Sequence, residues 1–366
     1  MKVLIVGNGG TGFNLKNGKS YINNHTGEFI ANVNKEVTTV FAQPKVNFNF
    51  NSNLLNYDLG DSKIKFLNLN PKKNFNFFII LIKLILNFDF IYIFYPSTLG
   101  KTIAILAFIF RKKYGLYIRG EHFLKSLTDK IVLRHSKLIL TISPLFVTKI
   151  SPFCNNIDII SPMISINKKD INTYRNYLNH SVVKFLFVGR LERSKGVLEI
   201  IQIAKVLKNR GLEFTIDLVG GGVLIDEIRS IIFRESLERF VFVRGQISDK
   251  ILLKNYYDSS NVFLFPSHHE GFPRVLYEAM ASGMPIFTTF VGGVSGRMKH
   301  LENCIEIPAK NWECSAEIIM EFIRNNNVLR KIGEGGIKTI RKLLESELEP
   351  HENLLIKYLK REFRQN

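Results

Sequence analysis

The chain has 366 residues, of which 46% are hydrophobic and 22% charged. This composition is typical of a globular protein and excludes a largely disordered one. The length exceeds what one ordinary hydrophobic core supports, so we expect two domains. Fifty Lys and Arg residues against 32 Asp and Glu give a formal charge of +18. That charge indicates an anionic partner: nucleic acid, an anionic membrane or a phosphorylated small molecule.

The N-terminal sequence MKVLIVGNGG predicts a strand that ends in a glycine turn, without the long apolar core and cleavage site of a signal peptide. Residues 7–12, GNGGTG, suggest a dinucleotide fingerprint, which needs a helix at once and an acid after the second strand. Here residues 13–27 delay the helix, and Gln43 stands in place of the acid. We therefore expect no nicotinamide or flavin cofactor.

Short apolar runs alternate with helical patterns through the first half of the chain. This alternation is typical of a parallel sheet with helices on both faces. The expected strands are residues 2–7, 36–42, 64–69, 90–95, 114–120 and 137–143, with helical stretches such as 98–111 between several of them.

The longest apolar run, residues 75–96, has to be tested against a membrane span, which needs about 20 largely uncharged apolar residues. Lys83, Asn87 and Asp89 interrupt the run. After Asp89 its composition changes to aromatic and β-branched residues, as in a buried strand. We predict a helix to about Asn87 followed by the strand FIYIFY; insertion at a membrane interface stays open as an alternative.

Near residues 159–181 the pattern changes to polar, Asn- and Lys-rich sequence, and a second α/β series follows. The sequence thus predicts two Rossmann-like, doubly wound domains, residues 1–170 and 171–345, that face each other across a cleft. A basic amphipathic helix in residues 346–366 is expected to pack back toward the first domain. In such sheets ligands bind beyond the carboxyl ends of the strands. The expected strands of the second series lie within residues 182–191, 214–222, 240–246, 262–267, 285–289 and 304–308.

Three cysteines, Cys154, Cys304 and Cys314, form no CxxC pair. An odd number without such a pair argues against a disulfide framework or a structural zinc and favours a reducing compartment. We expect the protein in the cytoplasm.

Two cations, Arg190 and Lys195, lie in the loop FVGRLERSKG, after one strand and before a helix that begins beyond Gly196. Two cations in one such loop suit a diphosphate, which needs neutralisation and several donors at once. A solvated basic loop is the alternative.

Two acids, Glu270 and Glu278, lie eight positions apart in LFPSHHEGFPRVLYEAMASGMPIFTT, the first in the turn after a strand and the second in the next helix. Backbone N–H groups at a helix N-terminus bind phosphate, and Gly271 permits close approach. Carboxylates accept hydrogen bonds from sugar hydroxyls, so Glu270 could hold a hexose and Glu278 a ribose. One of the two acids could equally cap the helix.

Together, GRLERSKG and PSHHEGFPRVLYEAMASGMPI resemble the retaining glycosyltransferases of family 4, which have the GT-B fold. The resemblance is strong from about residue 183 to 310 and weaker over the N-terminal half. It implies a retaining, metal-independent hexosyltransferase that uses a UDP- or GDP-linked sugar and no cofactor. The implied acceptor is a saccharide or a lipid-linked saccharide in the synthesis of capsule, lipopolysaccharide or another surface polysaccharide.

By position, the resemblance implies that Arg190 and Lys195 bind the donor diphosphate, that Glu270 holds the transferred sugar, and that Glu278 binds the ribose. Glu270 is expected to hold the sugar and not to act as a nucleophile. The other implied donor-binding positions are backbone groups near the phosphates, the sugar and the base: Gly9, Gly10, Gly245, Gln246, Ile247, Gly271, Phe272 and Pro273.

A histidine that contacts the donor sugar is common in the family after a strand of the first domain. The stretch YIRGEHF offers His122 as this second catalytic candidate, with RGEH where a simpler His-Gly pattern is usual; an ordinary loop histidine is the alternative.

His268 and His269 suggest a metal, but the sequence has neither HExxH nor an Asp-x-Asp motif. We expect no metal.

Two bound cations hardly account for a charge of +18. Lys72, Lys73 and residues 111–113 lie beside apolar helical stretches, a combination that suits peripheral attachment to an anionic membrane; a genome that favours lysine is the alternative.

Two rival functions remain. A nucleic-acid-binding protein would explain the charge, although no recognised module is present and no nucleic-acid partner is expected. A nucleotide-sugar epimerase or phosphorylase on the same fold should lack the paired glutamates.

Overall fold

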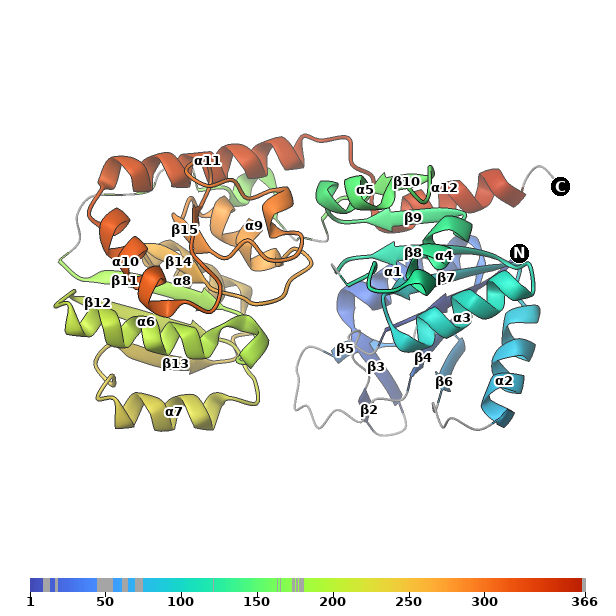
Figure 1. The fold of residues 1–366 in the computed structure, drawn as a ribbon, viewed down its shortest axis with the longest axis horizontal. Coiled ribbons are helices and arrows are strands. Elements are labelled where there is room, and N and C mark those ends of the chain that lie inside the picture. Colours follow the sequence, from blue (N-terminus) through green and yellow to red (C-terminus); the bar gives the residue numbers. More distant parts are fainter. Residues whose placement is uncertain are drawn as a thin grey trace. The chain divides into compact units, whose positions relative to one another are not determined.

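A computed structural model describes residues 1–8, 14–16, 19–44, 55–60, 65–69, 75–120, 122–162, 164, 166–172, 175, 177 and 181–363. The chain divides into two compact units, each with its own sheet (Figure 1). Unit 1 comprises Met1–Met163 together with Leu348–Asn366, and unit 2 comprises Ile164–Glu347.

Unit 1 is built on a seven-stranded parallel sheet in the order β10-β9-β8-β7-β1-β4-β6. The strands are β1 (Lys2–Val6), β4 (Thr38–Pro44), β6 (Lys65–Leu69), β7 (Phe90–Tyr95), β8 (Lys113–Ile118), β9 (Leu138–Thr141) and β10 (Ile157–Ile159). The helices are α1 (Asn24–Glu36), α2 (Phe75–Leu86), α3 (Thr98–Ile109), α4 (Leu127–His135), α5 (Pro144–Ile150) and α12 (His351–Phe363).

A small antiparallel sheet in the order β2-β3-β5 accompanies the main sheet of unit 1. Its strands are β2 (Asn14–Lys16), β3 (Lys19–Asn23) and β5 (Leu55–Asp58). These strands were not predicted from the sequence. Because β2 and β3 stand between β1 and α1, they are the reason that the helix after the first glycine turn is delayed.

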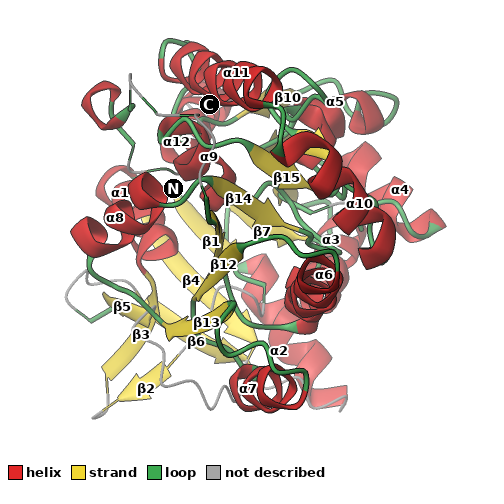
Figure 2. Cartoon of the chain, turned by 90° about the vertical axis from the view of Figure 1, so that its left-hand side faces the viewer, coloured by secondary structure: helices red, strands yellow, loops and turns green. Residues whose placement is uncertain are grey.

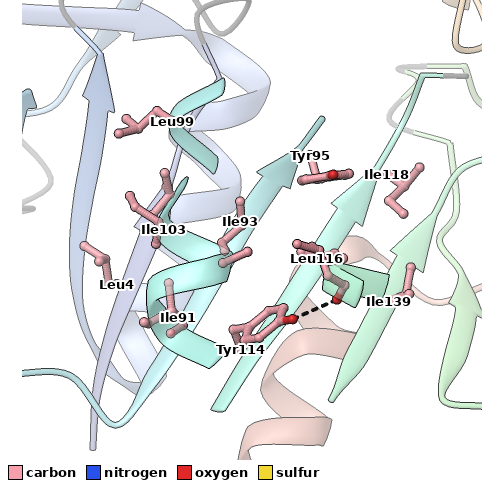
Figure 3. Close-up of a cluster of buried hydrophobic side chains, with 14 of the residues drawn as sticks. Leu4, Ile91, Ile93, Tyr95, Leu99, Ile103, Tyr114, Leu116, Ile118 and Ile139 are labelled. Carbon is pink, nitrogen blue, oxygen red and sulfur yellow. Dashed lines mark hydrogen bonds between the residues drawn. The ribbon is translucent and has the colours of Figure 1, made fainter. Parts of the chain in front are cut away.

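The sheet of unit 1 is covered on both faces, which explains why β7 is apolar at every position. Ile91, Ile93 and Tyr95 point into a core that includes residues of α2, α3 and α4, part of which is drawn in Figure 3. Phe90 and Tyr92 alternate with them and point into a second core with residues of α1 and α12.

The apolar run at residues 75–96 forms a helix and then a strand, as predicted. Helix α2 ends at Leu86, and β7 begins at Phe90. In the part of the chain that the structure describes, no helix combines the length and the apolar character that crossing a bilayer requires.

Unit 2 contains a six-stranded parallel sheet in the order β13-β12-β11-β14-β15-β16. Its strands are β11 (Val183–Val188), β12 (Phe214–Val219), β13 (Val241–Gly245), β14 (Val262–Phe265), β15 (Ile286–Thr288) and β16 (Ile305–Glu306). Its helices are α6 (Val197–Asn209), α7 (Ile225–Arg234), α8 (Lys250–Ser259), α9 (Arg274–Ala281), α10 (Trp312–Ile323) and α11 (Asn326–Leu344).

The strand order of unit 2 reverses once, between β11 and β14. From β11 the chain proceeds outward through β12 and β13, then returns to build β14, β15 and β16 on the other side. Helices α6 and α10 pack against each other, as do α9 and α11 (Figure 2). Two such parallel sheets confirm the predicted α/β class with two Rossmann-like halves, and the point of reversal is where ligands bind in such sheets.

The first residue of α12, His351, is buried in the second core of unit 1. Its ring stacks on Phe29 with 4.1 Å between centroids, and its Nε2 lies 2.6 Å from the hydroxyl of Tyr92. Nδ1 has no hydrogen-bond partner among the described residues. Burial, reinforced by the positive charge of Arg119, lowers the pKa of His351 to about 3.

The buried His351 predicts a loss of stability in weak acid. An unfolded chain protonates this histidine near its ordinary pKa of about 6.5, whereas the folded chain keeps it neutral to about 3. The stability is therefore fully present above pH 6.5 and is lost as the pH falls toward 3, by about 1 kcal/mol at pH 5.5. Urea unfolding at pH 7.5 and 5.5 should show this loss in the wild type and a smaller loss in His351→Phe. Equal losses in both proteins would contradict it.

Candidate functional site

Two loops meet at the point where the strand order of unit 2 reverses. One follows β11 and contains a 3-10 turn, η3 (Arg193–Lys195); the other follows β14. The carbonyl of Ser194 accepts hydrogen bonds of 3.0 Å from both the Ser267 hydroxyl and the backbone N–H of His268. Gly196 has φ +68°, and a Cβ there would lie 1.9 Å from the carbonyl oxygen of Pro266. The two loops are therefore in direct backbone contact.

These loops bring Lys195 and Glu270 together, 75 residues apart in the chain. The Lys195 Nζ lies 2.5 Å from Glu270 Oε1, with the two side chains 16% and 8% exposed. The Ser267 hydroxyl lies 2.8 Å from the same oxygen and shares its single hydrogen between this carboxylate and the Ser194 carbonyl. A nearly buried ion pair is stable only when further hydrogen bonds offset the loss of water, and Ser267 supplies one of them. Sequence reasoning missed Ser267.

Glu270 forms the ion pair with Lys195 and does not cap helix α9. Helix α9 begins after Pro273, whose side chain provides no capping hydrogen bond. Proline has no backbone N–H, so of the three residues predicted to surround Glu270 only Gly271 and Phe272 can donate from the backbone.

The loop after β15 holds Glu270 from another side. Gly292 has φ +60°, and a Cβ on it would lie 1.7 Å from the carbonyl oxygen of Glu270. The Thr289 hydroxyl donates to the carbonyl of Ser267. The backbone of the Glu270 turn is therefore fixed by contacts that leave no room for a larger residue at position 292.

Glu278 lies on α9 and has a buried partner on α8. The hydroxyl of Tyr257 donates to Glu278 Oε2 at 2.7 Å. Burial, and then the charge of Glu278, raise the pKa of Tyr257 well above its ordinary value. The guanidinium of Arg175 donates to the carbonyls of Tyr257 and Ser282 at 3.2 and 2.8 Å, which ties the ends of α8 and α9 together. From the sequence, the contact of Tyr257 could have been suspected only because the hydroxyl of a buried tyrosine needs a hydrogen-bond partner.

Arg190 lies in the same loop as Lys195 but is more exposed. It forms an ion pair of 2.8 Å with Glu192, and its side chain is 53% exposed.

His268, from the loop after β14, lies with its Nε2 3.0 Å from Glu199 Oε1 on α6. In the described ranges no group of three or more His, Cys, Asp and Glu residues is arranged to hold a metal ion.

The loops after β12 and β13 extend the same edge of the sheet. The backbone N–H of Gly220 donates to the carbonyl of Gly245 at 2.8 Å, and that of Leu191 donates to the carbonyl of Gly221 at 2.9 Å. Gln246 is exposed and Ile247 partly exposed. The post-strand loops of β13, β12, β11, β14 and β15 thus form one continuous rim, which includes the glycine run at residues 220–222 that sequence reasoning did not assign.

The remaining predicted site residues belong to unit 1. His122 follows β8 and is exposed. Gly9 and Gly10 lie outside the described residues. Their predicted roles therefore stay predictions.

The close contact at Gly292 predicts a large effect of one added methyl group. Gly292→Ala should lower the free energy of unfolding by about 3 kcal/mol or more, since its Cβ must displace the backbone of Glu270. Gly211 is a matched control, because it has φ +72° and no atom within 4 Å of a Cβ. Gly211→Ala should lower the free energy of unfolding by only about 1 kcal/mol, which is the cost of placing an alanine in the left-handed backbone conformation. Equal costs in chemical denaturation would show that the contact at Glu270 is not tight.

The order of the strands defines a parallel α/β sheet, and its candidate residues lie at the carboxyl edge, where such sheets bind ligands. Residues 170–339 match the model of the family Glycosyl transferases group 1.

Two curated relatives have names from polysaccharide synthesis. The chain is 29% identical over 199 residues to the capsular polysaccharide biosynthesis glycosyltransferase CapM of Staphylococcus aureus, a match that covers 53% of this chain and 51% of CapM. It is 29% identical over 194 residues to the amylovoran biosynthesis glycosyltransferase AmsK of Erwinia amylovora, covering 51% of this chain and 47% of AmsK. The chain thus matches about half the length of these relatives.

Among solved structures, the chain resembles HepE of Anabaena, determined in complex with UDP. The TM-score is 0.65 at 16% identity, with 100% of both chains covered. An identity of 16% supports a shared fold and nothing more. The likeness confirms the predicted GT-B fold class.

Proposed function

We propose that the protein is a retaining, metal-independent glycosyltransferase that moves a sugar from a nucleotide-sugar donor to a saccharide or lipid-linked acceptor. The observation that carries this proposal is the Lys195–Glu270 pair on the rim of unit 2. A cation suited to phosphate and an acid suited to sugar hydroxyls lie side by side there, as a molecule that joins a sugar to a diphosphate requires. The family match of residues 170–339, which contain both residues, supports it.

Lys195 can serve the diphosphate without releasing Glu270. An ammonium group has three N–H donors, and Glu270 Oε1 engages only one of them. A phosphate oxygen would take another, with Arg190 as the more exposed second cation. As the bond between the sugar and the diphosphate breaks, negative charge grows on the leaving phosphate, and both cations stabilise that charge.

Glu270 would orient the sugar and not attack it. Its Oε1 accepts from both Lys195 and Ser267, which makes Oε2 the oxygen that we assign to a sugar hydroxyl. Retention then follows a front-face path. The acceptor oxygen bonds to the anomeric carbon on the side from which the diphosphate departs, and its proton passes to a phosphate oxygen.

Glu278 and its partner Tyr257 would hold the nucleoside. With one carboxylate oxygen fixed by the Tyr257 hydroxyl, the other is oriented for a ribose hydroxyl. The backbone at Gly245, Gln246 and Ile247 would border the base.

The donor, acceptor and compartment are inferred from similar proteins and from the charge of the chain. HepE was solved with UDP, which favours a UDP-linked sugar over a GDP-linked one. CapM and AmsK carry names from capsular polysaccharide and amylovoran synthesis, so we propose a surface polysaccharide as the product. The reaction would take place in the cytoplasm, with peripheral contact to an anionic membrane.

A thermal-shift screen against UDP-, GDP-, ADP- and CMP-sugars without metal should show stabilisation by one nucleotide class. A ligand at about 100 times its dissociation constant adds roughly 2.7 kcal/mol. Lys195→Ala and Glu278→Ala should reduce the shift strongly. Tyr257→Phe should weaken binding about tenfold, because Glu278 loses its orienting hydrogen bond.

Arg193→Ala is the matched control for that screen. Arg193 is a cation of the same loop that pairs with Glu227 at 2.8 Å and is 70% exposed, so its loss should leave the shift unchanged. If folded wild-type protein responds to no donor, or if Arg193→Ala acts like Lys195→Ala, the donor site is wrong.

Retention and independence from metal can be tested together once the donor is known. The rate of transfer should be the same with and without EDTA, because the two cations take the place of a divalent ion. The anomeric proton coupling of the product, measured by NMR, should match that of the donor sugar. Inverted product would exclude the front-face path, and loss of activity in EDTA that added Mg²⁺ or Mn²⁺ restores would exclude the role assigned to Lys195 and Arg190.

A further inference from the structure

One surface of unit 1 presents large apolar side chains to solvent. It is formed by the outward face of α2, the C-terminal end of α3 and the adjoining part of α4. We call it the α2–α4 surface and define it by Ile79, Ile80, Leu86, Phe108, Ile109 and Ile131, which are 37–60% exposed.

Helix α2 is apolar on both of its faces. Leu81 and Ile85 are buried in the core of unit 1, while Ile79 and Leu86 lie on the opposite side of the helix. Ile79, Lys83 and Leu86 follow the i, i+4, i+7 spacing and therefore share one outward stripe. A surface helix of a globular protein normally turns a polar face to water, so the outward face of α2 is unusual.

The three helices present this apolar surface as one continuous patch. Helices α2 and α3 lie side by side, as Figure 1 shows, and α3 contacts α4. The Lys112 Nζ donates to the carbonyl of Leu86 at 2.8 Å, which ties the end of α2 to the turn after α3. At the end of α3, the ring of Phe108 lies 4.2 Å from that of His135 on α4. In soluble proteins, large apolar side chains that are grouped on one surface mark a site of interaction more often than singly scattered ones do.

The charges around the α2–α4 surface are almost all positive. Exposed cations lie on each of the three helices or just after it. They are Lys83 on α2, Arg111 after α3, Lys130 and Arg134 on α4, and Lys137 after α4. Among the described residues from 75 to 137 the acids are Asp89 and Asp129. Asp129 is 1% exposed and pairs with Lys101 at 2.6 Å, and the Asp89 carboxylate accepts from the backbone N–H of Lys2 at 2.7 Å.

We propose that the α2–α4 surface docks on an anionic lipid bilayer. Exposed apolar side chains with cations beside them are what the headgroup region of such a bilayer binds, since the side chains enter the acyl boundary and the cations meet lipid phosphates. A second copy of the chain would bring two positive surfaces together, which is repulsive. Nucleic acid would satisfy the cations but leave the apolar side chains without a partner.

The length of α2 fixes how it would lie. Twelve residues span about 18 Å, well short of the roughly 30 Å of a bilayer core, so α2 lies in the plane of the interface with Ile79, Ile80 and Leu86 directed into the lipid. Lys83, on the same stripe, extends its ammonium group to the phosphates. The inference rests on this surface and not on sugar transfer.

Co-sedimentation with vesicles tests the docking in the absence of any substrate. The wild type should bind vesicles of phosphatidylcholine with about one third phosphatidylglycerol, bind phosphatidylcholine alone at least about tenfold more weakly, and lose affinity as salt rises. The double variant Ile79→Glu/Ile80→Glu should bind the anionic vesicles about tenfold or more weakly.

Two further variants separate docking from misfolding. Phe233→Glu is the matched control, because Phe233 is 75% exposed on α7 of unit 2, and it should bind like the wild type. Arg111→Glu/Arg134→Glu changes only exposed side chains and should weaken binding roughly tenfold. Circular dichroism should show each variant folded.

Several outcomes would overturn the proposal. They are failure of the wild type to bind anionic vesicles, unchanged binding by Ile79→Glu/Ile80→Glu, and an equal loss in Phe233→Glu. Light scattering that shows a wild-type dimer, dispersed by Ile79→Glu/Ile80→Glu, would assign the surface to self-association instead. The response of these variants to the nucleotide-sugar in the thermal-shift screen should equal that of the wild type, so failure of the membrane proposal is distinguishable from failure of the donor site.

Discussion

The ion pair between Lys195 and Glu270 is the interaction on which the proposed site depends. It joins loops from two neighbouring strands and is nearly buried, so its formation removes water from both charges at a cost of several kcal/mol for each ion. The hydroxyl of Ser267 provides one compensating hydrogen bond. A diphosphate would provide further compensation, because it brings negative charge to the ammonium while a sugar hydroxyl satisfies the acid. The pair therefore suits the ligand that we propose, which carries both groups.

Sheet topology explains why this pair can form at all. Strands β11 and β14 are neighbours although more than seventy residues separate them, because the chain builds β12 and β13 on one side before it returns. The loops that follow the two strands leave the sheet at the same edge. Glycine at positions 196 and 292 then lets the backbones approach to distances that a side chain would prevent. The fold brings the two charges to one point, and the glycines fix the geometry there.

Most strands of the two parallel sheets were predictable because their signals are local; β10 was not among them. FIYIFY is aromatic or β-branched at every position and forms a fully buried strand. Lys195 and Glu270 became candidates because they lie in loops after strands, and Glu278 because it lies in the helix that follows. The small sheet β2-β3-β5 was missed, since its strands are three to five residues long and carry polar side chains. The Asn17-Gly18 dipeptide between β2 and β3 was the available hairpin signal. Ser267, Tyr257 and Gly292 were missed because their importance lies in contacts across the fold, which no local pattern encodes.

A crystal structure of the protein with its nucleotide-sugar would test the donor site most directly. We predict a diphosphate oxygen within hydrogen-bonding distance of Lys195 Nζ, a hydroxyl of the transferred sugar on Glu270, and a ribose hydroxyl on Glu278 beside Tyr257. A nucleotide bound elsewhere, with the Lys195–Glu270 pair intact and out of contact with it, would contradict the site and leave that pair a structural link between two loops.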